Sequence, residues 1–455
     1  MSPRTGRGRP VRIGDSRAGA RATAEFCTNY RRHPFRTRGP RITIRLRVLM
    51  PPECLTVLAP IKQGEVAALR GVLRPIGDDI NGTHMPPEGR PHVAFTKSRT
   101  IHFARFAILT DPDRGPDRAR LLYASVFDGT LAAHAAELVA LSSDFDAIWE
   151  KLEGYAGRDG FAQFLRAHAQ EPAAYYIAFR DETVSSIRLA IAALDARDNA
   201  VGQSSSGSRL LAGASATLAR VIRAAPLVKD LVVTVARHGF SDVYRGTLRI
   251  LASLDRYPVF RLVNRLTRNR LPPRRSPFSS VAIDACAAPA PLVPGDEIPS
   301  DLRPGFREDV ISQNQLTLVT VIAAGRVNRV RAVMSAIDSY AKRLAPPGSL
   351  IGISTIHFVR WLVIDNGRRL MMVSDYDGSW ENYIDEFAEM ILSGLDAIWE
   401  TSLAYPADGA RDLPAFKSFL RNHQVPAEVF FSAYPAETVL NIVNDSRLRD
   451  SGRAV

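Results

Sequence analysis

Two short phrases of this chain place a histidine and an arginine three residues apart inside an apolar, β-branched run. TIHFARF holds His102 and Arg105, and TIHFVRW holds His357 and Arg360. Imidazole and guanidinium groups could ligate a metal or haem there, or anchor an anion. On a β-strand, residues at odd spacing face opposite sides, so only a β-bulge would point both at one ligand. The candidate catalytic residues are His357, Arg360, His102 and Arg105.

The same residues also fit a structural role, and both interpretations stay open. Buried polar groups in proteins are hydrogen-bonded, and a buried arginine needs a carboxylate beside it. Asp128 and Asp377 could supply that carboxylate, in the phrases SVFDGT and SDYDGS. Turn and helix-capping chemistry by itself also explains these Asp-Gly-Thr and Asp-Gly-Ser runs.

Two further histidines, His168 and His423, close the phrases FAQFLRAH and FKSFLRNH. In the second phrase the histidine follows two phenylalanines and a leucine at the helical spacing i, i+3, i+4, i+7, so it shares their apolar face. A haem-ligating histidine has this pattern. So does a histidine that caps a helix C-terminus, where the helix dipole favours a protonated imidazole. The candidate cofactor-binding residues are His423, His168, Trp361, Tyr376, Asp377 and Asp128.

These phrases belong to a tandem duplication. LTVLAPIKQGEVAALRGVL parallels LTLVTVIAAGRVNRVRAVM, ETVSSI parallels ETVLNI, and DAIWE occurs identically at 146–150 and 396–400. Because order and spacing persist over about 140 residues, coincidence is excluded in practice. The tryptophans of DAIWE, Trp149 and Trp399, are predicted to pack in the core. If only one copy is functional, we expect it to be the second, which is richer in aromatic residues. It has Trp361, Trp380 and Tyr383 where the first copy has Phe106, Leu131 and His134.

Each copy predicts the element order β-α-β-β-α-β with additions, the split βαβ or ferredoxin-like unit. In the second copy a helical pattern begins at Val327, and strands over 356–364 and 370–374 are joined by the hairpin signal DNG. Ser379 is a predicted N-cap, and a terminal helix is expected from Pro435. One such unit leaves one sheet face bare, so two units can bury both bare faces by packing sheet against sheet.

A chain with two such units resembles the dimeric α+β-barrel superfamily in a fused, tandem-repeat form, over about 280 of its 455 residues. Distant similarity extends to the dye-decolourising peroxidases and chlorite dismutases. This resemblance implies an α+β fold in which the two repeats pack sheet to sheet as a pseudo-dimeric barrel. It also implies a haem cofactor and a peroxidase-like oxidoreductase activity if the protein is an enzyme. The peroxidases carry a G-x-x-D-G motif, of which only Asp-Gly is kept here, with Ser125 and Ser374 in place of the first glycine.

The positive charge of the chain is confined to two segments. The net charge is +12, yet residues 1–49 and residues 209–275 each carry an excess of 11 positive charges, so the rest of the chain is acidic. No apolar run reaches the roughly 18 residues that span a bilayer, and no signal peptide opens the chain. The three cysteines have no CxxC spacing, which excludes a disulfide framework and fits a cytoplasmic location.

These observations divide the chain into five parts. They are a disordered Arg-rich tail (1–50), a first ferredoxin-like repeat (51–199), a basic helical insert (200–275), a Pro-rich linker (276–308) and a second repeat (309–455). Translation starting at Met50 would account equally well for the first part. The apolar and arginine-bearing faces of 209–275 suit either an anionic membrane surface or an intramolecular lid. Nucleic-acid binding is disfavoured, because aromatic residues are few there.

The sequence therefore predicts that a hydrophobic or haem-like ligand binds between the two repeats, with loose attachment to a membrane. The chain contains no nucleotide-binding glycine motif, nucleophile elbow or zinc-protease motif. The alternative function is that of a non-catalytic structural or interaction scaffold, in which the duplicated polar residues only maintain the fold.

Overall fold

The computed structural model describes both copies that the sequence contains. The described residues are 51–81, 92–110, 118–142, 145–200 and 312–450. The predicted Arg-rich tail (1–50), the basic insert (200–275, beyond Ala200) and the Pro-rich linker (276–308) lie outside the described residues. Membrane contact through 209–275 therefore stays a prediction.

The first copy alternates strands and helices in the predicted order. Its elements are β1 (Glu53–Pro60), α1 (Val66–Asn81), β2 (Ile101–Thr110), β3 (Ala119–Phe127), α2 (Leu131–Leu141), α3 (Phe145–Trp149), α4 (Phe161–His168), β4 (Ala174–Ile177) and α5 (Val184–Ala200). The long strands β2 and β3 are buried along almost their whole length. A strand that is covered on both faces reads as a continuous apolar run, which explains why their sequences do not alternate.

The second copy repeats this order. Its elements are β5 (Gln313–Val321), α9 (Val327–Arg343), β6 (Ile356–Ile364), β7 (Arg369–Asp377), α10 (Trp380–Trp399), α11 (Leu413–Asn422), β8 (Ala427–Ser432) and α12 (Val439–Asp450). The predicted N-cap is confirmed, because the Ser379 hydroxyl accepts a hydrogen bond from the Asn382 amide at 3.2 Å. The terminal helix begins at Val439 rather than at Pro435.

The strands form two antiparallel four-stranded sheets in which the two copies exchange their last strands. The strand orders are β1-β3-β2-β8 and β4-β6-β7-β5. β8 of the second copy pairs with β2, and β4 of the first copy pairs with β6. The division into a repeat over 51–199 and a repeat over 309–455 therefore does not divide the sheets. Periodicity identifies a strand but not its partner, since any free strand edge offers the same backbone groups.

The segment just before each last strand forms a backbone hydrogen bond with its own copy, and the chain then crosses to the other sheet. The Gln170 amide donates to the Thr56 carbonyl at 2.7 Å ahead of β4. In the second copy the Val425 amide donates to the Thr317 carbonyl at 2.8 Å ahead of β8. Strand pairing therefore continues from the β1 edge into β4 and from the β5 edge into β8.

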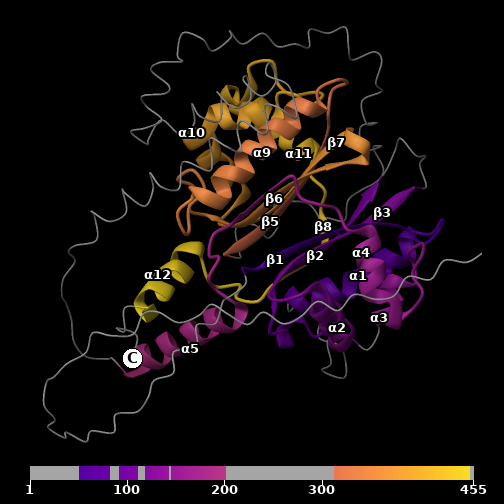
Figure 1. Ribbon diagram of the computed structural model, residues 1–455, viewed down its shortest axis with the longest axis vertical. Coiled ribbons are helices and arrows are strands. Elements are labelled where there is room, and N and C mark those ends of the chain that lie inside the picture. Colours follow the sequence, from indigo (N-terminus) through magenta and orange to yellow (C-terminus); the bar gives the residue numbers. More distant parts are fainter. Residues whose placement is uncertain (1–50, 82–91, 111–117, 143–144, 201–311, 451–455) are drawn as a thin grey trace, which may run out of the picture. The chain divides into compact units, whose positions relative to one another are not determined.

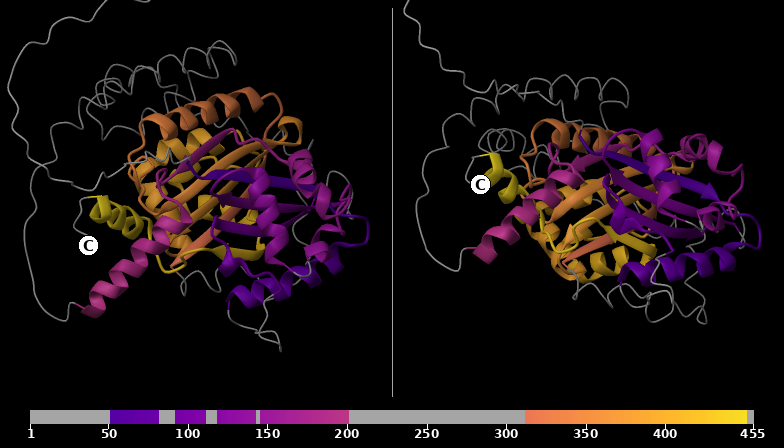
Figure 2. Two further views of the ribbon diagram at one scale, coloured as in Figure 1. Left: turned by 60° about the horizontal axis from the view of Figure 1, so that its bottom comes forward. Right: turned by 90° about the horizontal axis from the view of Figure 1, so that it is seen from below.

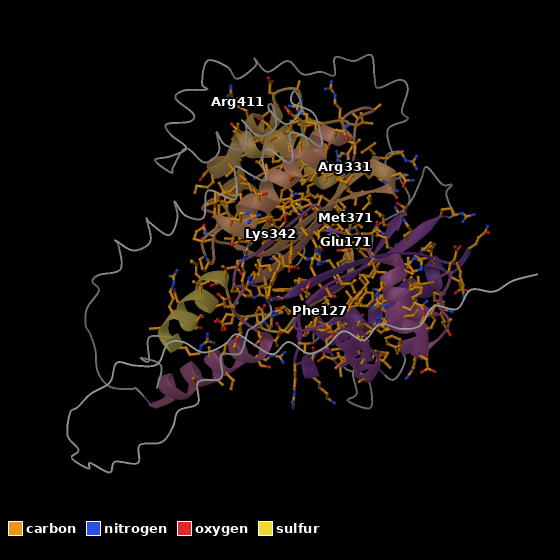
Figure 3. All side chains as sticks on the ribbon, in the orientation of Figure 1. Phe127, Glu171, Arg331, Lys342, Met371 and Arg411 are labelled. Atoms are coloured by element: carbon orange, nitrogen blue, oxygen red, sulfur yellow. The ribbon has the colours of Figure 1, made fainter. Side chains whose placement is uncertain are left out.

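The two sheets face each other, and helices cover their other faces. Apolar side chains from both sheets meet in one buried cluster: Leu58, Ala107, Leu109, Leu122, Ala124, Leu362, Ile364, Met371 and Val373. Met371, labelled in Figure 3, belongs to this layer. Figure 1 shows α9, α10 and α11 over β5, β6 and β7, and α1 to α4 on the outer side of β1, β2 and β3. Trp149 and Trp399 are buried, as predicted.

The last helices of the two copies, α5 and α12, project side by side away from the sheets (Figure 2). Glu182, just before α5, is buried and accepts hydrogen bonds from Arg449 and Ser446 of α12. This contact also joins the two copies, outside the sheets.

Candidate functional site

β2 and β6 each contain a β-bulge at their histidine. The pairing with β3 and β7 shifts register at His102 and at His357. The bulges place these rings among the side chains that lie between the two sheets. The ring centroid of His102 is 5.6 Å from that of Phe358, and the ring centroid of His357 is 5.3 Å from that of Phe103.

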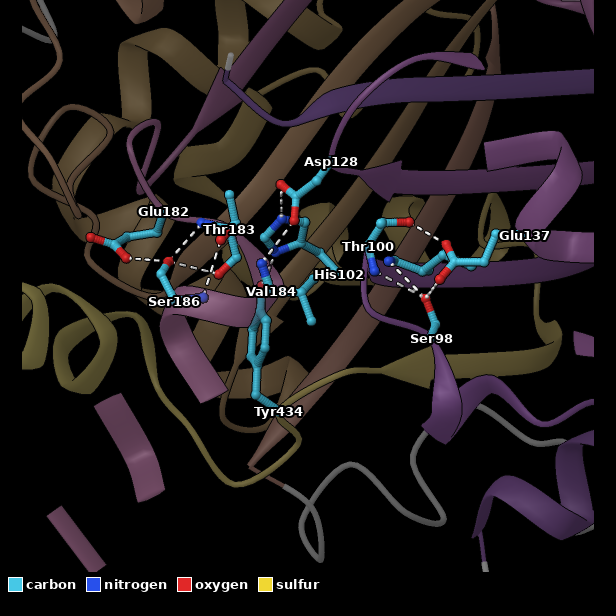
Figure 4. A network of polar contacts seen from close by, with 11 residues as sticks. Ser98, Thr100, His102, Asp128, Glu137, Glu182, Thr183, Val184, Ser186 and Tyr434 are labelled. Atoms are coloured by element: carbon cyan, nitrogen blue, oxygen red, sulfur yellow. Dashed lines mark hydrogen bonds and ion pairs between the residues drawn. The ribbon is translucent and has the colours of Figure 1, made fainter. Parts of the chain in front are cut away.

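Both ring nitrogens of His102 have hydrogen-bond partners (Figure 4). Nε2 lies 3.0 Å from Oδ1 of Asp128, and Nδ1 lies 2.8 Å from the Tyr434 hydroxyl. Burial raises the pKa of Tyr434 well above its ordinary value, so the hydroxyl keeps its proton and donates to Nδ1. The other oxygen of Asp128 accepts from the Val184 amide at 2.9 Å, in the first turn of α5. His102 is thereby connected through Asp128 to a helix start.

His357 repeats this arrangement with one partner missing. Its Nε2 lies 2.6 Å from Oδ1 of Asp377, whose other oxygen accepts from the Val439 amide at 2.8 Å at the start of α12. Its Nδ1 is buried and has no hydrogen-bond partner. Phe179 occupies the position equivalent to Tyr434, with its ring centroid 5.8 Å from that of His357, and it offers no hydroxyl. The two copies therefore differ by one hydrogen bond.

These contacts assign the duplicated aspartates to the histidines. The sequence interpretation offered Asp128 and Asp377 as partners of the arginines, whereas the structure pairs them with His102 and His357. In each copy one carboxylate accepts from an imidazole and from a helix N-terminus at once. A carboxylate is favoured at a helix N-terminus by the helix dipole, which explains an aspartate at this position.

Arg105 crosses from the first sheet to the second, where both of its terminal nitrogens have hydrogen-bond partners. It is 1 % exposed and forms an ion pair with Asp375. Its Nη1 donates to Gln315 Oε1 at 3.0 Å and to Thr317 Oγ1 at 3.2 Å, and its Nη2 donates to the Ser374 carbonyl at 2.8 Å. Burial lowers the pKa of Arg105, and the Asp375 carboxylate opposes this by stabilising the charged form.

Arg360 crosses in the opposite direction and has far fewer partners. It is 2 % exposed, and its Nη1 donates to the Ser125 carbonyl at 2.9 Å, the counterpart of the Ser374 carbonyl. Its Nε is buried and has no hydrogen-bond partner. No ion pair of Arg360 with a carboxylate occurs among the described residues.

The difference arises from the side chains that face the two arginines. In the second sheet Asp375 and Gln315 are paired neighbours on β7 and β5. The equivalent neighbours on β3 and β1 are Val126 and Cys54. An isopropyl group and a thiol therefore replace the carboxylate and the carboxamide that face Arg105. Arg360 also interacts with Cys54: burial raises the pKa of this thiol, and the charge of the guanidinium and a hydrogen bond with it act in the opposite direction.

Further polar groups near Arg360 also lack partners. Tyr175 is the direct cross-strand neighbour of Arg360, and its hydroxyl is buried without a hydrogen bond. The same holds for the hydroxyl of Thr56, which is equivalent to Thr317. Burial raises the pKa of Tyr175 well above its ordinary value and raises that of Cys54, so both groups keep their protons at neutral pH.

The remaining predicted cofactor residues lie elsewhere in the fold. His423 caps α11, with Nδ1 donating to the Phe419 carbonyl at 2.7 Å, and burial lowers its pKa. The pKa of His168, at the end of α4, is also lowered by burial. Trp361 is buried on β6, and Tyr376 stacks on Tyr383 of α10 with ring centroids 3.9 Å apart. The structure does not bring these residues together with the strand histidines.

The repeated histidine–arginine phrase indicates Arg360, but no pattern within one copy indicates the residues that the fold sets beside it: Cys54, Thr56, Tyr175 and Val126. An alignment of the two copies contains the signal, because it sets Val126 against Asp375 and Cys54 against Gln315. This difference between the copies can be interpreted only when it is known that the arginine of one copy faces the strands of the other.

The chain matches no protein-family model, no curated protein and no solved structure. Within the described ranges, no group of three or more His, Cys, Asp or Glu side chains is placed to hold a metal ion. In the same residues, no helix has the length and apolar character needed to cross a membrane.

Proposed function

We propose that the protein is a non-catalytic ligand-binding protein whose ligand lies between the two sheets, beside Arg360. The observation that carries this proposal is a buried arginine without an ion pair among the described residues, next to a counterpart that has an ion pair and four further hydrogen-bond acceptors. A buried guanidinium that lacks a counter-charge is strongly unfavourable, and a bound ligand would supply the missing interaction.

The proposed architecture is the fused, pseudo-dimeric barrel of two ferredoxin-like repeats. Its support is the pairing of each sheet's outer edge with the segment that leads into the other sheet, at Thr56 with Gln170 and at Thr317 with Val425. Small barrels hold either packed side chains or one small ligand in their interior. The exchange of β4 and β8 would make the two copies inseparable, so the interior would stay intact when a ligand leaves.

Haem stays a prediction, and the residues offered for it do not favour it. Both ring nitrogens of His102 are hydrogen-bonded, and the free Nδ1 of His357 faces the ring of Phe179. His423 uses Nδ1 to cap its own helix. A macrocycle between the sheets would also have to displace the apolar cluster that both sheets share. The residues present therefore do not fit a haem group.

A binding role is favoured over catalysis because the strand histidines are already committed to the fold. His102 and His357 each bond an aspartate that in turn bonds a helix start. General acid–base catalysis needs an ionisable group within hydrogen-bond reach of a substrate. The groups beside Arg360 are a thiol and hydroxyls, and Glu53 and Glu171, the carboxylates that act on the thiol, are exposed to solvent.

The test is mass spectrometry of the purified full-length protein under native and denaturing conditions, together with its absorption spectrum. We expect a small non-covalent mass that is lost on denaturation, or a ligand recovered from a screen of small molecules by thermal denaturation. We expect no Soret band. A Soret band on haemin titration that disappears in His423→Ala or His357→Ala would overturn the proposal in favour of haem. A protein that binds nothing in either assay would favour the scaffold instead.

A further inference from the structure

We infer that the ligand beside Arg360 is a small carboxylate, held where the structure of the other copy holds the carboxylate of Asp375 beside Arg105. This inference rests on the proposed function and names the chemical class of its ligand. It follows from the internal symmetry of the chain, because one half of the interior shows what an arginine in this position requires.

The backbone surroundings of the two arginines are the same. Arg105 donates to the Ser374 carbonyl at 2.8 Å, and Arg360 donates to the equivalent Ser125 carbonyl at 2.9 Å. Each guanidinium therefore donates a hydrogen bond to the equivalent backbone carbonyl of the opposite sheet. What differs is the residue next to that serine, which is Asp375 in one sheet and Val126 in the other.

The charge between the sheets is consequently unbalanced. Arg105 and Arg360 are both nearly fully buried, and they lie close enough that Arg360 acts to lower the pKa of Arg105. Asp375 is buried beside one of them, whereas Glu53 and Glu171, the carboxylates near Cys54, are exposed to solvent. One positive charge between the sheets thus lacks a buried counter-ion. An anion that enters from solvent restores the balance that Asp375 provides in the other half.

The donors around Arg360 suit a carboxylate. Its Nε is unpartnered, and a guanidinium offers parallel N–H groups that match the two oxygens of a carboxylate. The protonated hydroxyls of Tyr175 and Thr56 are also unpartnered and can donate to the same oxygens. Val126 contributes an apolar surface at the position equivalent to Asp375, which suits the aliphatic chain of such a carboxylate.

A multiply charged anion fits less well. Phosphate sites in proteins gather several positive charges or charged donors around one group, whereas the donors beside Arg360, the hydroxyls of Tyr175 and Thr56, are neutral. The replaced group in the other half is a monocarboxylate, with one charge and two oxygens. A purely hydrophobic ligand fits less well too, because it would leave the guanidinium without a counter-charge.

The experiment compares acids with their matched amides on the full-length protein. Formate, acetate, propionate and butyrate are titrated against formamide, acetamide, propionamide and butyramide, with inorganic phosphate as a further arm. Binding is followed by isothermal calorimetry and by the midpoint of thermal unfolding. At least one acid is expected to bind with a 1:1 stoichiometry and to raise the midpoint, while its amide binds about tenfold more weakly or worse because it carries no charge.

Two reciprocal variants supply the control. Val126→Asp places a carboxylate beside Arg360 and is expected to abolish the response to the acid. Asp375→Val removes the carboxylate beside Arg105 and is expected to raise the stoichiometry from one acid per chain to two. If either variant fails to fold, Arg360→Met, which replaces the charge with an apolar chain of similar length, tests the same point and should lose acid binding.

The outcomes separate this inference from the proposed function. Equal binding of acid and amide, or acid binding that survives Arg360→Met, would overturn the carboxylate while leaving a ligand between the sheets. Tight binding of phosphate alone would do the same. If no probe binds and the purified protein carries no small molecule, both the inference and the proposed function fail.

Discussion

The halves of the molecule that surround Arg105 and Arg360 share a backbone but differ in how they treat a buried positive charge. Around Arg105 a carboxylate, a carboxamide and a hydroxyl accept hydrogen bonds from the guanidinium. Around Arg360 the backbone carbonyl contact is kept and the carboxylate is absent. A duplicated fold thus preserves the contacts made by the backbone, because the strands supply them whatever the sequence. Contacts made by side chains can diverge one residue at a time.

The histidine pairs show the same rule on a smaller scale. Both copies keep the bond from imidazole to aspartate and from aspartate to the start of a helix. Only His102 keeps a partner for its second nitrogen, because Tyr434 stands where the other copy has Phe179. The histidine and arginine of β2 thus have more polar partners than those of β6, where Nδ1 of His357 and Nε of Arg360 are buried without one.

The largest expected effect is the loss of the counter-charge of Arg105. Asp375→Val makes the second half resemble the first and leaves a second buried guanidinium uncompensated. We expect the free energy of unfolding to fall by about 3–5 kcal/mol, as measured by urea denaturation. The reciprocal change, Val126→Asp, should cost less than about 1 kcal/mol because the new carboxylate finds Arg360 beside it. Equal losses in the two variants would contradict the proposed difference between the halves.

A second prediction concerns His134, which stands where the second copy has Tyr383. Burial lowers the pKa of His134 to about 3, whereas an unfolded histidine titrates near its ordinary value of about 6.5. The folded state therefore keeps this ring neutral. The contribution of this neutral ring to the stability of the folded state is fully present above the unfolded pKa. It is lost as the pH falls below that value, because the unfolded state then binds a proton that the folded state does not bind.

The expected loss from this one residue is about 2 kcal/mol between pH 7 and pH 5. His134→Tyr copies Tyr383, whose hydroxyl bonds Ser374 at 2.6 Å, and should flatten this part of the stability curve measured by urea denaturation at several pH values. Tyr383→Phe, which changes no group that titrates in this range, is the control and should leave the slope unchanged. An unaltered slope in His134→Tyr would show that another group is responsible.

The smallest expected effect is the exchange of one hydroxyl between the halves. Tyr434→Phe removes the donor to Nδ1 of His102 and should cost about 1–2 kcal/mol, because it leaves a buried acceptor unsatisfied. Phe179→Tyr offers His357 the donor that it lacks and should add about 0.5–1 kcal/mol. Both values come from thermal and urea unfolding. A loss of stability in Phe179→Tyr would contradict the equivalence of the two positions.

Much of the local structure could be predicted from the sequence because local physics determines it. The apolar runs that contain the histidines become β2 and β6, the helical spacing from Val327 becomes α9, and the Ser379 hydroxyl caps α10 by accepting from the Asn382 amide. The duplication could be read directly, since it is a property of the order of residues. The partners of the duplicated histidines and arginines could not, because sequence distance says nothing about which strand edge faces which.

The sequence by itself determined that the chain holds two similar halves, that each carries a histidine and an arginine in an apolar strand, and that only one half has an aspartate at position 375 or its equivalent. The tertiary structure alone decided that the last strands are exchanged and that each arginine points into the other half's sheet. The physical reason is that a buried charge responds to whatever lies within a few ångströms of it. For Arg360 one such neighbour, the Ser125 carbonyl that accepts its hydrogen bond, lies 235 positions away along the chain.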